Sequence, residues 1–308
     1  MLELLRSIPI LSHLLLAESH GMSFLDALPI VQNGLLASCL AAIVCSFLGI
    51  YILLKRMVFV SAALTQFSAL GIALALILTE FFLPQGPLAA STHSAHDADL
   101  LSNAAALLFA CLVASGLAVH TQERRITRES LLGIGYVLPA GLSLVILDRV
   151  TTHPGLIEGV LFGNAVFVTS QQLLMLALAC TVVLCLHGLL YKEFVFTSFD
   201  PETAKASGLR TLLLNQLLFF TLAVSTSVAI GCIGALPVFA FMVIPAAAAL
   251  MLVSRLLPAF LLAMGIGVTS ALAGFYLSFL FALPTGPTMI ATAGLFLVPG
   301  FFVSWWGR

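Results

Sequence analysis

Charged side chains are scarce in this chain. Asp, Glu, Lys and Arg together make up 8% of its 308 residues, whereas 61% of the residues are hydrophobic, and the mean hydropathy is +1.16. Soluble domains use roughly 45–50% apolar residues, so a separate water-soluble domain is excluded. The composition is that of an integral membrane protein whose helices face lipid and one another.

Several short motifs of enzymes and metal centres are missing as well. The sequence has no GxxxxGK[ST] phosphate loop, no HExxH zinc motif and no CxxC pair, and its six cysteines lie in or beside apolar runs. A P-loop ATPase needs the phosphate loop to hold its nucleotide, and a disulfide framework or thiolate metal site needs suitably spaced cysteines. We therefore expect no enzyme, no permanently bound cofactor and no nucleic-acid partner.

Apolar runs that are long enough to cross a bilayer, about 17–25 residues each, recur almost end to end. We expect an all-α, polytopic bundle of eight or nine spans in contact with membrane lipid, at roughly residues 34–54, 59–83, 101–120, 131–148, 168–191, 211–231, 235–253, 258–281 and 288–306. The run 235–253 is ambiguous, because Gly234, Pro237 and Pro245 allow a broken helix or a re-entrant segment. Residues 23–308 are expected to form one transmembrane domain, after an extension, 1–22, that is an interfacial helix, a segment without function or a cleaved signal peptide.

Lysine and arginine are unevenly distributed between the two ends of these spans. If the first span runs inward, only Arg6 and Arg149 lie outside, and ten basic residues lie inside: Lys55, Arg56, Arg124, Arg125, Arg128, Lys192, Lys205, Arg210, Arg255 and Arg308. Basic residues concentrate on the cytoplasmic side of membrane proteins. The segment 192–210 is therefore expected in the cytoplasm.

The segment 192–210 holds six charged residues in a chain that has few. Asp200 is a good N-cap, Pro201 suits the first helical turn, and Glu202 places negative charge near the helix N-terminus. Gly208 is a stop signal. We expect a short helix of about two turns, on a surface that a soluble partner recognises.

Two larger loops are expected on the opposite face, at 84–100 and 149–167. The first combines turn-forming residues with two imidazoles and two carboxylates, at His93, His96, Asp97 and Asp99. Such side chains are ordinary ligands for zinc or manganese, so the four are a candidate metal site. The alternative is a solvated loop, because closing a flexible loop around a metal costs entropy.

Polar groups inside the spans are candidates for a solute pathway, because polar side chains in lipid are costly and tend to be functional. Gln66, Asn164 and Tyr136 are the candidates, and Gln66 lies deepest. An interhelical hydrogen bond is the alternative for Gln66. His187 falls near a span end, like Glu80, His120 and Asp148, where solvent contact explains these groups.

Five markers in order resemble the membrane permease subunits of ATP-binding-cassette importers for zinc, manganese and iron, from about Phe24 to the C-terminus. They are Lys55-Arg56-Met57, Leu131-Leu132-Gly133-Ile134, Leu161-Phe162-Gly163, the element 200–208, and Gly234-Ala235-Leu236 with Ile244-Pro245-Ala246-Ala247. The resemblance implies a homodimer in a bacterial inner or plasma membrane. It would receive a divalent metal from an extracytoplasmic binding protein and would be driven by a separate cytoplasmic ATP-binding-cassette ATPase. The coupling helix that fits the ATPase would comprise Asp200, Pro201, Glu202, Ala204, Lys205 and Gly208.

The chain departs from that family inside the second span. Members commonly carry an Asp and, four residues later, a His, where this chain has Ala62 and Gln66. They often have an Asp after the Phe-Gly pair, where this chain has Asn164. Amide carbonyls can coordinate a hard cation, though weakly compared with carboxylate and imidazole. A permease for another solute, such as a metal chelate, and an ATP-independent channel or secondary transporter are therefore the alternatives.

Overall fold

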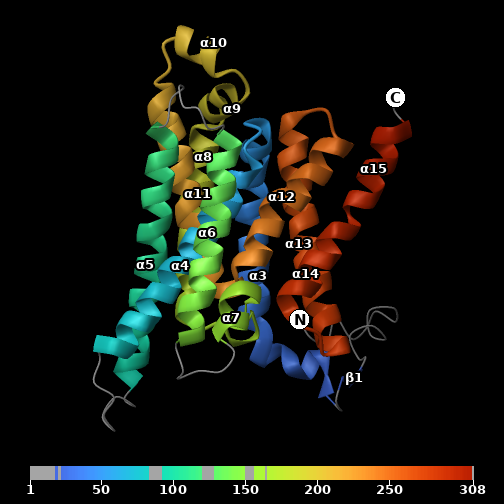
Figure 1. The fold of residues 1–308 in the computed structure, drawn as a ribbon. Helices are drawn as coiled ribbons and strands as arrows, with labels where there is room; N and C mark the ends of the chain where they lie inside the picture. The colour runs from blue at the N-terminus through green and yellow to red at the C-terminus, as the bar shows by residue number, and fades with distance from the viewer. Residues whose placement is uncertain are drawn as a thin grey trace.

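The protein is a bundle of long helices, as the computed structural model in Figure 1 shows. The structure describes residues 18–19, 22–82, 92–119, 128–149, 156–163 and 165–306. Its α-helices are α3 (Phe24–Leu54), α4 (Val58–Phe82), α5 (Thr92–Val119), α6 (Arg128–Arg149), α7 (Leu156–Phe162), α8 (Ser170–Leu189), α9 (Tyr191–Phe199), α10 (Pro201–Ala206), α11 (Thr211–Ile233), α12 (Ala235–Leu252), α13 (Leu256–Phe281), α14 (Thr285–Leu295) and α15 (Leu297–Trp306). A 3-10 helix, η1, covers Ala165–Phe167, and two-residue strands β1 (Glu18–Ser19) and β2 (Met22–Ser23) pair antiparallel. The expected all-α class is confirmed.

Eight helical segments of the described chain are long and apolar enough to cross a membrane. They are α3, α4, α6, α8, α11, α12, α13 and the pair α14–α15. A ninth apolar stretch, Leu101–Gly116, lies within α5, which runs alongside the others in Figure 1. The expected number of spans agrees with these helices. The division into an extension, 1–22, and a domain, 23–308, stays a prediction.

Helical segments occupy parts of both expected outer loops, so the expectation of non-helical structure there was wrong. α5 begins at Thr92, and α7 and η1 lie within 149–167. The physical reason in the first loop is that the helix-breaking prolines, Pro84 and Pro87, precede residue 92 and two alanines follow it. The polar residues 92–100 therefore extend an apolar helix beyond its membrane-spanning part.

The ambiguous run 235–253 is one helix, α12, which continues through Pro245 from Ala235 to Leu252. The break falls before it, at Gly234, which ends α11 and begins α12 with a φ of 86° and a ψ of 165°. That backbone region is essentially restricted to glycine. Gly234 lies against the backbone of Phe162 and Gly163, and Gly163 also has a positive φ, 77°. One residue therefore reverses the chain beside the end of α7.

The interior of the bundle is built around α3, which packs against α12 and α13. Gly49 of α3 meets the backbone of Met242, and Gly267 of α13 meets Ser46, so the missing side chains let these helices approach closely. Ser46 Oγ donates to the Phe241 carbonyl at 3.1 Å. The outer helices instead expose large leucines, including Leu112 on α5 and Leu174 on α8. This apolar exterior is suited to lipid.

Basic residues gather at the end of the bundle that carries α10. Lys55 and Arg56 lie in the α3–α4 turn, Lys192, Lys205 and Arg210 lie in or beside α9–α11, and Arg255 lies in the α12–α13 turn. Arg149 ends α6 at the opposite end (Figure 1). Among the described residues, this distribution is the one that the positive-inside rule expects for a cytoplasmic α10.

Candidate functional site

The short helix α10 lies at one extremity of the molecule and starts where the sequence predicts. Asp200 is its N-cap and accepts a hydrogen bond from the Thr203 amide at 3.1 Å, while Pro201 occupies the first turn. Hydrogen bonds from the side chain and the backbone of Thr203 hold the pKa of Asp200 below its ordinary value. The cap therefore favours the charged carboxylate, which also suits the positive end of the helix dipole.

The end of α10 is closed by a Schellman motif. Gly208 has a φ of 85°, its amide donates to the Lys205 carbonyl at 3.1 Å, and the Leu209 amide donates to the Ala204 carbonyl at 3.1 Å. Such a motif satisfies carbonyls that a helix end leaves free. Ala204 is fully buried, whereas Glu202 and Lys205 are exposed. α10 thus rests on the bundle by one methyl group and presents its charged face outward.

A second helix, α9, precedes α10 and was missed by the sequence reasoning, which placed one helix in 192–210. Its buried residues are Phe194, Thr197 and Ser198. Their spacing of three and four residues is the pattern of one helix face, and it was the signal available. The pattern was missed because two of the three buried residues are polar, so the segment shows no apolar periodicity. α10 packs on α9 and α11, and α9 packs on α3, α8 and α11.

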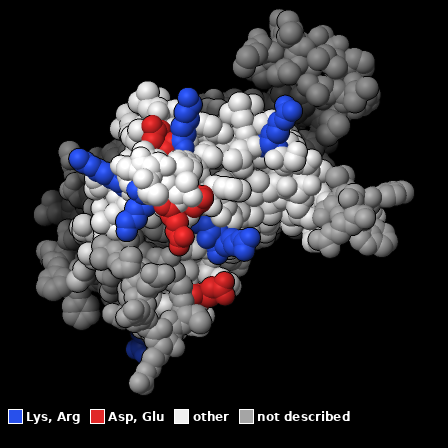
Figure 2. Space-filling model, turned by 90° about the horizontal axis from the view of Figure 1, so that it is seen from above, with Lys and Arg blue, Asp and Glu red and all other residues white. Residues whose placement is uncertain are grey.

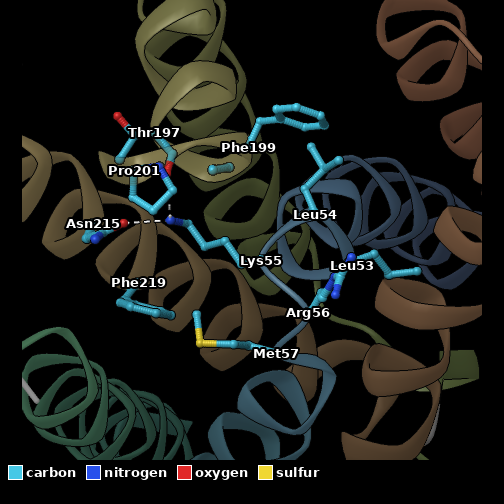
Figure 3. A pocket seen from close by; sticks show the side chains of 11 residues that line it. Leu53, Leu54, Lys55, Arg56, Met57, Thr197, Phe199, Pro201, Asn215 and Phe219 are labelled. Carbon is cyan, nitrogen blue, oxygen red and sulfur yellow. Dashed lines mark hydrogen bonds between the residues drawn. The ribbon is translucent and has the colours of Figure 1, made fainter. Parts of the chain in front are cut away.

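Lys55 connects the α3–α4 turn to α9 and α11. Its Nζ donates to Asn215 Oδ1 at 2.7 Å and to the Thr197 carbonyl at 3.4 Å, across a pocket of about 580 Å³ (Figure 3). The turn itself is a second Schellman motif, in which the Met57 amide donates to the Ile52 carbonyl at 3.1 Å. Arg56 takes the left-handed position, with a φ of 55°. The first family marker is therefore a tight turn that aims a lysine at α9.

Charged side chains of both signs are scattered among uncharged residues on this face of the molecule (Figure 2). The acidic residues there come from α6, α9 and α10, and the basic ones from the turns and helix ends named above; the acidic ones are Glu129, Glu193, Asp200 and Glu202. A mixed, structured surface at one end of an apolar bundle is suited to a soluble protein partner.

Gln66 lies in the middle of α4 and is 2% exposed, and its Oε1 has no hydrogen-bond partner in the described part of the chain. Ala62, one turn earlier, is buried as well. α4 packs on α5, α6, α11 and α12, so Gln66 is enclosed by the bundle. Tyr136 of α6 is half-buried. Asn164 lies outside the described residues. The pathway roles of Gln66, Tyr136 and Asn164 all stay predictions.

The four candidate metal ligands fall at the start of α5. The backbone of His93, His96, Asp97 and Asp99 is helical, and their side chains lie outside the described residues. Within the part that the structure describes, no group of three or more His, Cys, Asp or Glu side chains is placed to hold a metal ion. The metal site at these four residues stays a prediction.

His187 contradicts the expectation of solvent contact, because it is fully buried. Its Nε2 lies 2.9 Å from Thr221 Oγ1, and its ring stacks on Phe194 with a centroid distance of 4.2 Å. The sequence correctly predicted that His187 lies near the end of a span, which is α8. Its burial follows from α9, which the sequence reasoning did not predict and which covers this end of α8.

The fold and the capped α10 together define a polytopic helical membrane permease that has a separate surface for a soluble partner. The ABC 3 transport family matches residues 27–304. The chain belongs to that family, and it is a permease subunit of ATP-binding-cassette type in the bacterial plasma membrane.

Named relatives agree with this family. The chain is 28% identical over 276 residues to the manganese transport system membrane protein MntC of Listeria monocytogenes, covering 88% of this chain and 91% of the relative. It is 27% identical over 286 residues to the manganese import system permease protein ScaB of Streptococcus pneumoniae, covering 91% and 94%. The solved structure of PsaBC from Streptococcus pneumoniae in complex with Fab has the same fold, with a TM-score of 0.76, 23% identity and coverage of 91% and 95%.

Proposed function

We propose that this permease imports a divalent transition metal, manganese in the first place, and is driven by a separate ATPase that docks on α10. The observation that carries the proposal is α10 itself, a helix of six residues closed at both ends and held to the bundle by Ala204. A fully capped helix of this length, with its charged side outward, is a rigid element that a partner can push. The sequence contains no phosphate loop, so ATP would be used by the partner.

The chemistry of Gln66 supports manganese over zinc. Its Oε1 is buried, has no hydrogen-bond partner within the described ranges, and is a hard oxygen donor in the span. Oxygen ligands suit manganese, whereas imidazole and thiolate favour zinc. With Ala62 and Gln66 in place of a carboxylate and an imidazole, the pathway would hold the cation weakly, which favours passage over retention. The manganese relatives are consistent with this assignment.

The assembly that we propose has four further parts. A second copy of the chain would complete a homodimer around the pathway, two ATPase subunits would bind the two copies of α10, and an extracytoplasmic binding protein would deliver the metal. In this proposal the permease works without a permanently bound cofactor. The outward start of α5, with His93 and His96, lies at the end where the delivered metal would arrive (Figure 1).

Uptake by vesicles that contain the permease, its ATPase and its binding protein tests the proposal. We expect ATP-dependent accumulation of manganese that exceeds accumulation of zinc and iron. A vesicle with an ATPase that binds but does not hydrolyse ATP is the control, and it should accumulate none of the three. Equal uptake in that control would show an ATP-independent carrier and overturn the proposal.

Charge reversal at α10 tests the docking surface separately. Glu202→Lys should weaken association of the ATPase and reduce uptake, because Glu202 is exposed near the helix N-terminus, where positive charge is unfavourable. Glu129→Lys is a matched control on the same face but on α6. Normal uptake and substrate-stimulated ATP hydrolysis in Glu202→Lys would refute docking on α10.

A further inference from the structure

Three aromatic rings contact the imidazole of His187, and a fourth, from Phe260 of α13, packs on two of them. Phe194 stacks on it at 4.2 Å with an interplanar angle of 16°, Tyr51 lies 5.1 Å away and Phe47 5.8 Å away, measured between ring centroids. Phe260 closes the group against Phe47 at 4.9 Å. We name Phe47, Tyr51, His187, Phe194 and Phe260 the aromatic cluster.

The aromatic cluster joins α9 to the centre of the bundle. Phe194 is the buried aromatic residue of α9, Tyr51 and Phe47 belong to α3, and Thr221, which is hydrogen-bonded to His187, belongs to α11. Lys55 forms a second connection between the same elements, through Thr197 and Asn215. Because α10 packs on α9 and α11, these two connections link α10 to α3.

Packing alone does not account for the polar members of the cluster. His187 Nδ1 and Tyr51 Oη are buried without a hydrogen-bond partner among the described residues, and so are Thr197 Oγ1 and Ser198 Oγ on the same face of α9. A buried polar group without a partner lowers stability, and an apolar side chain of the same shape would avoid that loss. Four such groups therefore gather around α9 within the part of the chain that the structure describes, and packing does not explain their presence.

We propose that His187 is a positioning residue that couples movement of α9 and α10 to α3 and α11. Thr221 holds the imidazole plane in the orientation on which Phe194 stacks, and Tyr51 of α3 lies against the same ring. A shift of α9 is therefore transmitted to α3 and, through His187, to α11. Packed side chains with two discrete arrangements are the physical form that such coupling takes. This inference rests on the proposed function, because it requires an ATPase that moves α10.

The coupling ratio, manganese transported per ATP hydrolysed by the complete transporter in vesicles, measures this role. His187→Ala removes both the stack and the hydrogen bond, and we expect the ratio to fall about tenfold, within the range of measured couplings between sites. Thr221→Val and His187→Phe each remove the hydrogen bond and keep the packing, and we expect a fall of about threefold in each. Leu189→Ala, at an exposed position of the same helix, is the matched control and should leave the ratio unchanged.

A double substitution separates coupling from simple destabilisation. If His187 acts through Thr221, His187→Phe combined with Thr221→Val should lower the ratio no further than either single change. An unchanged ratio in both single variants would overturn the proposal, and so would losses that multiply in the double variant. If His187→Ala does not fold, the two single variants still decide. Normal uptake in Glu202→Lys would instead refute docking on α10 itself.

Discussion

Gly234 is a position where one added methyl group should be strongly destabilising. Its φ of 86° and ψ of 165° lie in a region that other residues avoid. A Cβ at this position would also overlap backbone atoms of Phe162 and Gly163, which cannot rotate away as a side chain would. Gly234→Ala therefore combines backbone strain with overpacking.

The two costs can be set out separately. Backbone strain in this region is worth about 1–3 kcal/mol, and overpacking a closed site about 1–3 kcal/mol more. Gly234→Ala should therefore lower the free energy of unfolding by about 2–6 kcal/mol. Gly208 is the matched control, because its φ is also positive, at 85°, but open space surrounds its Cβ position. Gly208→Ala should cost only the strain, about 1–2 kcal/mol.

Thiol reactivity during unfolding in mixed micelles provides the assay. Cys45 and Cys232 are buried and should react with a maleimide dye only when the bundle opens, whereas Cys185 is exposed and gives the baseline. In the Gly234→Ala variant, the midpoint of the unfolding transition, followed by the reaction of Cys45 and Cys232, should lie well below the midpoint of the Gly208→Ala variant. Equal midpoints would show that Gly234 and the end of α7 do not touch as described.

Two further predictions concern the pathway and the cap. Gln66→Leu should impair manganese uptake while raising the free energy of unfolding by about 1 kcal/mol, because it removes a buried oxygen that has no partner among the described residues. Vesicle uptake and the thiol-reactivity assay check the two effects, and normal uptake would exclude Gln66 from the pathway. The hydrogen bonds from Thr203 lower the pKa of Asp200, so the extra stability that the charged cap confers is present above pH 3.8 and is lost as the pH falls through the lowered value. Hydrogen exchange at the Thr203 amide should show that acid step in the wild type, and Asp200→Asn, which keeps an acceptor without a charge, should remove it.

The spans and α10 could be predicted because their signals are local. Each span is a long apolar run, and the start and stop of α10 are encoded within nine residues, from Asp200 to Gly208. The resemblance to the importer family predicted an ATPase as the partner of α10. α5 could not be bounded in this way, because its first turns are polar and a helix outside the membrane needs no apolar run.

The aromatic cluster could not be predicted because its members are far apart in the sequence. Phe47, His187 and Phe260 meet only after α3, α8 and α13 have packed. The burial of His187 depends on α9, and only one of the three buried residues of α9, Phe194, is apolar. Periodicity within one segment carries no information about which distant helix covers it.

The single-residue corner at Gly234 also has a mechanical consequence. α11 and α12 are joined there, at the end of the bundle remote from α10, so a tilt of α11 about this corner would move its other end most. With 23 residues, α11 is about 34 Å long. A tilt of about 5° at the corner would displace the opposite end by about 3 Å. A small tilt of α11 about Gly234 would thus displace its other end far enough to repack the side chains where α11 meets α9 and α10.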